Sequence, residues 1–229
     1  GWAALYMMYQ PHIETVLDRR CKALPTVTVM QGVTVDALEQ GGGAVSVGGV
    51  RRDGRRVEVH ARFLVGADGG TGFIRRALGI AISDYSFQEN WLVCDFRKRR
   101  RLDRVPTFRQ VCDPAQPIAI VQIGPDHHRF SFMLDRDEPI ERATDEQRVW
   151  QRVGQYLARD DADLIRVANY VFRSRIAERW QAGHVMLAGD TAHEMPPFLA
   201  QGMCSGIRDS HNLAWKLDLI LAGRAKSAI

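Results

Sequence analysis

Residues 183–217 read GHVMLAGDTAHEMPPFLAQGMCSGIRDSHNLAWKL and join a short apolar run to a long helical pattern through an acidic turn and two prolines. The apolar run, residues 185–188, is continuous rather than alternating, which is typical of a parallel strand covered on both faces. It ends at Gly189-Asp190. Ligands of open α/β sheets lie at the carboxyl ends of the strands. Asp190 is therefore placed to accept hydrogen bonds from sugar-type hydroxyls, as the acidic residue of dinucleotide-binding folds does.

The segment after Asp190 predicts a stiff loop and then an amphipathic helix. Pro196 and Pro197 restrict the backbone, and Gly202 allows the backbone to approach a ligand closely. Apolar or small residues then recur at helical spacing, at positions 203, 207, 210, 214, 217 and 221. Gly223 is placed to cap the helix end. A helix N-terminus has free N–H groups and a partial positive charge, so it favours an anion. The alternative is that Asp190 is a surface N-cap and the glycines only shape a tight turn.

A second strand–glycine–helix unit reads FLVGADGGTGFIRRALG, residues 63–79. An apolar strand stops at Gly66, Asp68 follows, and a short helical pattern is closed by Gly79. Taken alone, this pattern leaves open whether Asp68 binds a ligand or satisfies nearby backbone N–H groups. Two acidic residues at strand ends in one chain favour the binding role.

The remaining pattern mixes helices and strands. Residues 9–23 predict a helix with proline in its first turn, and residues 26–66 predict a β-meander whose last strand runs from 57 to 68. Residues 87–134 alternate as strands. Thr144-x-x-Gln147 is a capping-box signature for a helix to about Arg159, and a strand over 164–176 follows. The class is therefore mixed α/β, of the α+β kind, with a sheet-rich insertion between the two glycine-rich units.

Composition limits the classes of protein that fit. The 229 residues are 45% hydrophobic and 25% charged, which is ordinary for a globular protein, and no apolar run approaches a membrane span. The four cysteines lack C-x-x-C spacing, which argues against a zinc ribbon and favours a reduced, cytoplasmic setting. The net charge of +4 owes much to the basic run at 96–104. We interpret that run as a solvated loop or strand edge, because no nucleic-acid-binding module accompanies it.

The two glycine-rich units carry a resemblance to a known family. GADGGTGFIRRALGI, residues 66–80, resembles the Asp-Gly motif of single-component FAD-dependent aromatic hydroxylases, and residues 183–217 resemble their Gly-Asp motif. The stretch YQPHIETVL is similar to the helix that precedes the β-meander of this family. The stretches VCDPAQP, FML and YVFRSRIAERWQAG resemble the branch of 3-(3-hydroxyphenyl)propionate hydroxylase. No G-x-G-x-x-G follows an N-terminal strand. The resemblance therefore implies an FAD/NAD(P)-binding-type fold lacking its first βαβ unit, and we expect a chain opening on Gly1 to be the central part of a longer enzyme.

The resemblance also implies a division of the chain. Residues 1–80 are expected to form part of the FAD-binding domain, and residues 81–178 a substrate-binding sheet and helix. Residues 179–229 then return to the FAD-binding domain. Trp91, Phe108, Phe130, Phe132 and Met133 alternate in the inserted sheet, so core packing is the plain expectation and an aromatic pocket is the functional one.

Residue by residue, the resemblance implies the following contacts. Asp190, with Gly189, would bind the ribityl or pyrophosphate region of FAD. The stretch Gly202-Met203-Cys204 would approach the flavin, with the N–H groups of Met203 and Cys204 at its N1/O2 edge.

Four further residues complete the implied site. Asp68 and Gly69 would serve both FAD and NADPH binding, Gln10 would be a further FAD contact, and Pro197 would border the substrate. Two departures from the family stand out: Gly72 replaces a usual serine, and Cys204 replaces a frequent asparagine.

The chemistry implied is flavin-based, so no catalytic side chain and no metal ligand is expected. NADPH or NADH would reduce the flavin, and molecular oxygen would form a flavin hydroperoxide that hydroxylates a small phenolic substrate. His193 is interpreted as satisfying backbone groups rather than as a general base, and Arg75 and Arg76 as either phosphate contacts or solvated charges. A homodimer is one option for the assembly. The alternatives are other flavin chemistry (polyketide hydroxylation, epoxidation or halogenation) or a flavin-free fragment that binds a ligand or partner.

Overall fold

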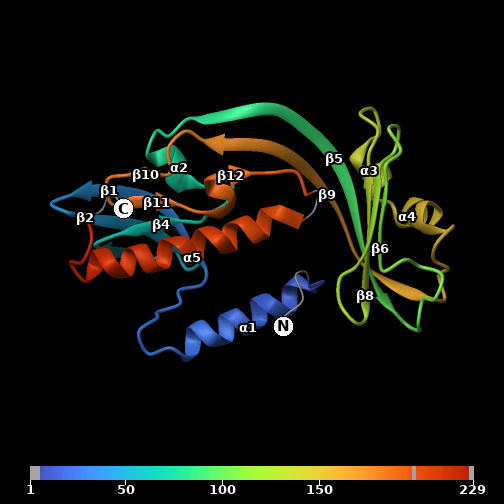
Figure 1. Ribbon diagram of the computed structural model, residues 1–229, viewed down its shortest axis with the longest axis horizontal. Coiled ribbons are helices and arrows are strands. Elements are labelled where there is room, and N and C mark those ends of the chain that lie inside the picture. Colours follow the sequence, from blue (N-terminus) through green and yellow to red (C-terminus); the bar gives the residue numbers. More distant parts are fainter. Residues whose placement is uncertain (1–5, 198–199, 227–229) are drawn as a thin grey trace. The chain divides into compact units, whose positions relative to one another are not determined.

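The computed structural model describes residues 6–197 and 200–226, and its elements are labelled in Figure 1. The chain divides into two compact units. Unit 1 takes the residues up to 29 together with 89–171, and unit 2 takes 30–88 together with the residues from 172 onward. The division expected from the sequence has its boundaries at 80/81 and 178/179 and assigns the first helix to the FAD-binding part. The two compact units have other boundaries, and the first helix belongs to unit 1. The functional names of those parts stay predictions.

Unit 2 contains two three-stranded sheets. The first is an antiparallel meander in the order β1-β2-β3, made of β1 (Val33–Gly41), β2 (Ala44–Arg51) and β3 (Arg56–Ala61). The second has the order β10-β11-β4, made of β10 (Gln181–Ala182), β11 (Val185–Leu187) and β4 (Leu64–Gly66). The predicted parallel strand is confirmed, because β11 pairs parallel with β4, with Val185 opposite Leu64 and Leu187 opposite Gly66.

Two strand predictions in this region are wrong. Residues 26–30 form no strand. The single strand predicted over 57–68 is divided between β3 and β4, which lie in different sheets. The physical reason is His184, whose ring bonds the carbonyl of Arg62 at 3.0 Å while its own carbonyl accepts from the Leu64 N–H at 3.0 Å. These bonds draw the chain away from β2 and onto β11.

The core of unit 2 brings α2 (Phe73–Ala77) against the parallel strands. Ile74, Val185 and Leu187 are buried in one cluster. Gly66 permits this packing, since a Cβ on it would lie 2.8 Å from Ile74 Cγ2 and 3.2 Å from Leu187 Cδ2. Gly79, at φ +60°, closes α2 as predicted.

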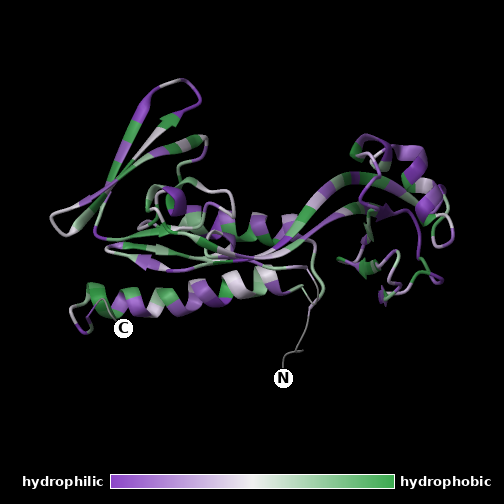
Figure 2. Cartoon of the chain, turned by 90° about the horizontal axis from the view of Figure 1, so that it is seen from above, coloured by the Kyte–Doolittle hydropathy of each residue, from purple (hydrophilic) through white to green (hydrophobic). Residues whose placement is uncertain are grey.

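The last helix of unit 2, α5 (Gln201–Leu221), has the predicted position and end. Gly223 sits at φ +71° and donates to the Ile220 carbonyl, and Arg224 donates to that of Leu219, which is a Schellman motif. Figure 2 shows apolar and polar residues alternating along this C-terminal helix. None of its residues is buried against the described part of the chain: Met203 is 46% exposed and Ile207 58%.

Unit 1 holds the helix α1 (Gln10–Ala23), with proline in its first turn as predicted, and an antiparallel sheet. Within this unit the strands pair in the order β5-β8-β7-β6, and β5 and β9 each continue into unit 2. The bounds are β5 (Ile82–Lys98), β6 (Phe108–Val111), β7 (Ile118–Gln122), β8 (His127–Met133) and β9 (Ala162–Ala177).

One face of this sheet forms the core of unit 1. Cys94 lies opposite Phe130 and Leu92 opposite Phe132, and all four are buried together with residues of α4 (Glu146–Val153). Core packing therefore accounts for the two phenylalanines, whereas Phe108 is 51% exposed. The aromatic pocket stays a prediction.

The basic run at the end of β5 is bound to acidic side chains. Arg97 and Arg99 both pair with Asp163, and Arg100 pairs with Asp161. The interpretation of this run as a strand edge and loop fits those pairs. None of the described helices is long and apolar enough to cross a membrane.

The capping box was predicted one residue too early. Asp145, not Thr144, is the N-cap of α4, and its carboxylate accepts from the N–H groups of Gln147 and Arg148 at 3.0 and 3.1 Å. The Thr144 hydroxyl instead donates to the Ile140 carbonyl at 2.9 Å, at the end of α3 (Ile140–Ala143). The helix ends at Val153 rather than at Arg159.

Asp145→Ala should lower the free energy of unfolding by about 1 kcal/mol, because two N–H groups lose their cap. Urea unfolding of the full-length protein measures this. Asp137→Ala is the matched control, since Asp137 is exposed and caps no helix. Equal losses in the two variants would contradict the capping role.

Candidate functional site

The parallel pair β4–β11 brings the two glycine-rich motifs to one sheet edge. Gly66 and Leu187 are register partners, so Asp68 and Asp190 both follow strand ends that lie side by side. The Ala188 N–H donates to the Gly66 carbonyl at 3.0 Å and extends this pairing past the strands. Parallel pairing therefore places two carboxylates, 122 positions apart in sequence, at the same edge.

A single hydroxyl connects the motifs. Thr191 is 1% exposed, and its Oγ1 accepts from the Gly69 N–H at 2.8 Å and donates to Asp68 Oδ1 at 3.1 Å. The other oxygen of Asp68 accepts from the Ile74 N–H at 2.8 Å, at the start of α2. The Asp68 carboxylate is therefore engaged by the protein itself. Sequence reasoning missed Thr191, although it lies directly after Asp190.

Asp190 has a different environment. It lies in the short helix η1 (Gly189–Thr191), it is exposed, and its carboxylate bonds with no other described residue. Gly189 before it has φ +61°, in the left-handed region that favours glycine. The turn thus presents a carboxylate that is free to accept hydrogen bonds from a ligand.

A third carboxylate holds this turn against α5. Asp209 Oδ2 accepts from the Gly189 N–H at 2.9 Å and lies 2.7 Å from His193 Nε2. His193 is 7% exposed, and its ring lies 5.1 Å from that of Trp180. The expectation that His193 satisfies backbone groups is wrong, because its partner is a side chain. Asp209 was missed, since a sixteen-residue separation carries no local signal.

Glu194, in β12 (His193–Glu194), makes a further contact between the motifs. Its carboxylate occupies the space beside Gly70, where a Cβ would lie 2.3 Å from Glu194 Cδ. Arg175 lies 3.7 Å from Glu194 Oε2 and bonds Asp84 at 2.7 Å. The Ser86 N–H and then Arg175 hold the pKa of Asp84 below its ordinary value. Residue 70 must be a glycine for this packing, because a side chain there would clash with the Glu194 carboxylate.

The start of α5 supplies backbone donors. The helix begins at Gln201, so the N–H groups of Gly202 and Met203 are among those without an acceptor inside the helix. The N–H of Cys204 is the first that can bond within the helix, to the Ala200 carbonyl. Gly206, one turn further on, allows α5 to approach the motif, since a Cβ there would lie 3.4 Å from Gly189 Cα.

This geometry can be compared with known proteins. The chain matches, over residues 1–229, the profile of a family described as FAD binding domain. The chain belongs to this family. This match and the hydroxylases described below confirm the predicted resemblance to FAD-dependent aromatic hydroxylases. The mixed α/β class is confirmed as well.

Named relatives of the FAD-binding domain include two bacterial hydroxylases. The chain is 54% identical to a probable NADH-specific resorcinol 4-hydroxylase of Rhodococcus jostii (strain RHA1), over 100% of the chain and 43% of that protein. It is 33% identical to a 3-(3-hydroxy-phenyl)propionate/3-hydroxycinnamic acid hydroxylase of Klebsiella pneumoniae (strain 342), over 100% of the chain and 41% of that protein. The chain thus spans about two fifths of the length of these relatives.

A solved structure shares the fold. Aklavinone-11 hydroxylase, crystallised with FAD and aklavinone, superposes with a TM-score of 0.84 at 26% identity. The match covers 96% of this chain and 43% of that chain.

The other predicted site residues of the FAD-binding domain are placed as follows. Pro197 is exposed and is the last described residue before 198–199. Gln10 belongs to unit 1 and donates to Glu14 at 2.7 Å. Arg75 donates to the Ile80 carbonyl and Arg76 to that of Gly72, so both guanidinium groups contact their own segment.

The departure at Gly72 has a structural counterpart. A Cβ on Gly72 would lie 2.2 Å from Asp68 Cγ. The carboxylate of Asp68 therefore occupies the space that a serine side chain would need. In this FAD-binding domain, the glycine allows Asp68 to cap α2.

Thr191→Val should lower the free energy of unfolding by about 1–3 kcal/mol, because Asp68 and the Gly69 N–H lose a buried partner. Thermal and urea unfolding of the full-length protein measure the effect. Thr191→Ser keeps the hydroxyl and should lose much less. If serine and valine are equally destabilising, the hydroxyl bonds are not what stabilises the motif.

Proposed function

We propose that the chain is the central part of an FAD- and NAD(P)H-dependent enzyme that hydroxylates a phenolic compound. The observation that carries this proposal is the free carboxylate of Asp190, held at the carboxyl end of a parallel strand in a chain that matches an FAD-binding domain throughout. A βαβ unit with a dinucleotide-binding fingerprint, which residues 6–197 and 200–226 do not form, would hold the remaining half of the cofactor.

The residues present fit the polar groups of a flavin. The Asp190 carboxylate would accept hydrogen bonds from the ribityl hydroxyls or lie beside the pyrophosphate region. The N–H groups of Gly202 and Met203, in the first turn of α5, would face the N1/O2 edge of the ring, which gains negative charge when the flavin is reduced. When bound, the flavin supplies the redox and oxygen chemistry.

The protein's own task is to bind and orient. The bonds of Thr191 and Asp209 hold the turn that presents Asp190, so the carboxylate needs little reorganisation when a ligand arrives. Pro197 would stiffen the backbone beside the substrate. Asp68, with Gly69, would act by holding the two motifs together while contributing to FAD and NADPH binding. Gln10 stays a predicted contact. The N–H of Cys204 can bond to the Ala200 carbonyl at the start of α5, so in this proposal the N–H of Gly202 replaces it beside that of Met203.

The relatives indicate which compounds to test. Identity of 54% to a probable NADH-specific resorcinol 4-hydroxylase supports a hydroxylated benzene as substrate and NADH as reductant. A larger polyketide-type aromatic substrate is the second candidate, supported by the fold shared with aklavinone-11 hydroxylase. The four free cysteines fit a reducing compartment such as the cytoplasm. A homodimer stays a prediction.

Asp190→Asn should weaken FAD binding to the full-length protein about tenfold or more, because a charged acceptor is lost. Its melting temperature should change little, since the side chain has no partner in the described fold. FAD titration by fluorescence measures the affinity. Glu178→Gln is the control, because Glu178 is an exposed acid of the same unit. Unchanged FAD affinity in Asp190→Asn would remove the role given to this residue.

The full-length, FAD-loaded protein should oxidise NADH faster when resorcinol is added and should form a product that carries one more oxygen atom. Absorbance of NADH and mass spectrometry of the product measure the two events. 3-(3-Hydroxyphenyl)propionate and NADPH form the comparison arms. A protein that binds no FAD, or that oxidises NADH without forming a hydroxylated product from either phenol, would refute the proposal.

A further inference from the structure

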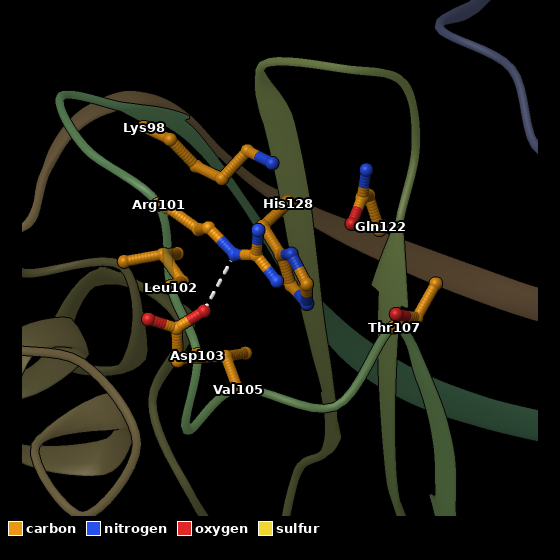
Figure 3. Close-up of a pocket in the computed structure, with 8 residues that line it drawn as sticks. All are labelled: Lys98, Arg101, Leu102, Asp103, Val105, Thr107, Gln122 and His128. Atoms are coloured by element: carbon orange, nitrogen blue, oxygen red, sulfur yellow. Dashed lines mark hydrogen bonds and ion pairs between the residues drawn. The ribbon is translucent and has the colours of Figure 1, made fainter.

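Exposure separates the polar side-chain pairs that can fix a position in this chain from those that cannot. Arg101 and Asp103, beside a cavity of about 370 Å³ in unit 1, pair at 2.6 Å (Figure 3), but their side chains are 91% and 73% exposed. Water screens such a pair, so it contributes little. His193 and Asp209 of unit 2 lie 2.7 Å apart, and their side chains are only 8% and 17% exposed. This second pair is shielded from water and can hold the segments that it joins.

Asp209 contacts the chain on both sides of Asp190. Its Oδ2 accepts from the Gly189 N–H at 2.9 Å and lies 2.7 Å from His193 Nε2. An ionised carboxylate only accepts, so Nε2 carries the hydrogen of this contact. Gly189 precedes Asp190 directly, and His193 follows it within one turn. One oxygen therefore fixes the turn before and after the Asp190 carboxylate, which has no partner of its own among residues 6–197 and 200–226.

The face of α5 that carries Asp209 also contacts this segment through two glycines. Gly202, Gly206 and Asp209 are spaced four and three positions apart, so they share one face of the helix. A Cβ on Gly206 would lie 3.4 Å from Gly189 Cα, and one on Gly202 would lie 3.9 Å from Met195 Cγ. The glycines leave room for close contact along about two turns of helix, and Asp209 supplies its hydrogen bonds.

We propose that Asp209 is a positioning residue for the flavin, an inference that rests on the proposed function. Asp190 and the first N–H groups of α5 belong to different segments, and the flavin would contact both. Asp209 joins these segments, so it sets the distance between the carboxylate and the helix N-terminus before the flavin arrives. Binding then requires little ordering of the protein. Asp209 acts through Gly189 and His193 and does not itself contact the flavin.

Two variants of Asp209 separate position from charge, because both of its hydrogen bonds end on one oxygen. Asp209→Asn keeps an oxygen for that position and loses the negative charge. Asp209→Ala removes both bonds. In the full-length protein, Asp209→Ala should weaken FAD binding about tenfold and Asp209→Asn by less than about threefold. Equal losses in the two variants would overturn a role that depends on position.

A double-mutant cycle tests whether Asp209 acts through Asp190. FAD titration of the full-length protein measures the affinity of Asp209→Ala, Asp190→Ala and the double variant. In a chain that already lacks the Asp190 carboxylate, Asp209→Ala should weaken binding by less than about threefold. A residue that only supports the fold would lose the same factor in both backgrounds, so additive losses contradict the proposal. Asp218→Ala is the control, since Asp218 is an exposed acid of the same helix, and it should leave FAD affinity unchanged.

Hydrogen exchange without flavin tests the contact itself. In the flavin-free, full-length protein, Asp209→Ala should speed exchange of the amide hydrogens of residues 189–193 about tenfold, because the Gly189 N–H loses its acceptor. Asp209→Asn should exchange as the unchanged protein does, and mass spectrometry of the peptides measures both. Unchanged exchange in Asp209→Ala refutes the contact, whether or not FAD binds.

The two readouts also distinguish this inference from the proposed function. A full-length protein that binds FAD, but equally well with and without Asp209, refutes the positioning role alone. A protein that binds no FAD refutes the proposed function and with it the flavin role of Asp209.

Discussion

The hydroxyl of Thr191 is the contact on which the candidate functional site depends. It joins the Gly69 N–H and the Asp68 carboxylate of one motif to the turn that carries Asp190. Parallel pairing of β4 with β11 brings the motifs to one edge, and this buried hydroxyl then sets how their loops meet. Because the group is fully buried, a lost bond leaves two polar groups unsatisfied, and the arrangement is correspondingly specific.

Three carboxylates of unit 2 have different roles because their partners differ. Asp68 caps α2 and accepts from Thr191, so it organises the fold. Asp209 anchors the Gly189 turn and His193 against α5. Asp190 alone of the three has no partner among the described residues and remains available to a ligand.

Much of the local structure could be predicted from the sequence. Short-range patterns predicted several elements: the bounds of α1, the strand β11, and the glycines that end α2 and α5. Motifs of the same short range predicted the family. The errors share another cause. The strand predicted over 57–68 is divided by hydrogen bonds to His184, and the cap of α4 moved from Thr144 to Asp145 because Thr144 bonds back to α3. In both cases a competing partner replaced the one that the local pattern favoured.

The sequence by itself determined where strands stop at acidic turns, which glycines end helices, and which family the chain belongs to. These features depend on backbone conformation and on hydrophobic periodicity, which are properties of neighbouring residues. Only the tertiary structure decided that Asp68 is occupied and Asp190 is free, and that His193 pairs with Asp209. The role of a polar side chain depends on which donors and acceptors surround it, and those come from segments brought together by folding.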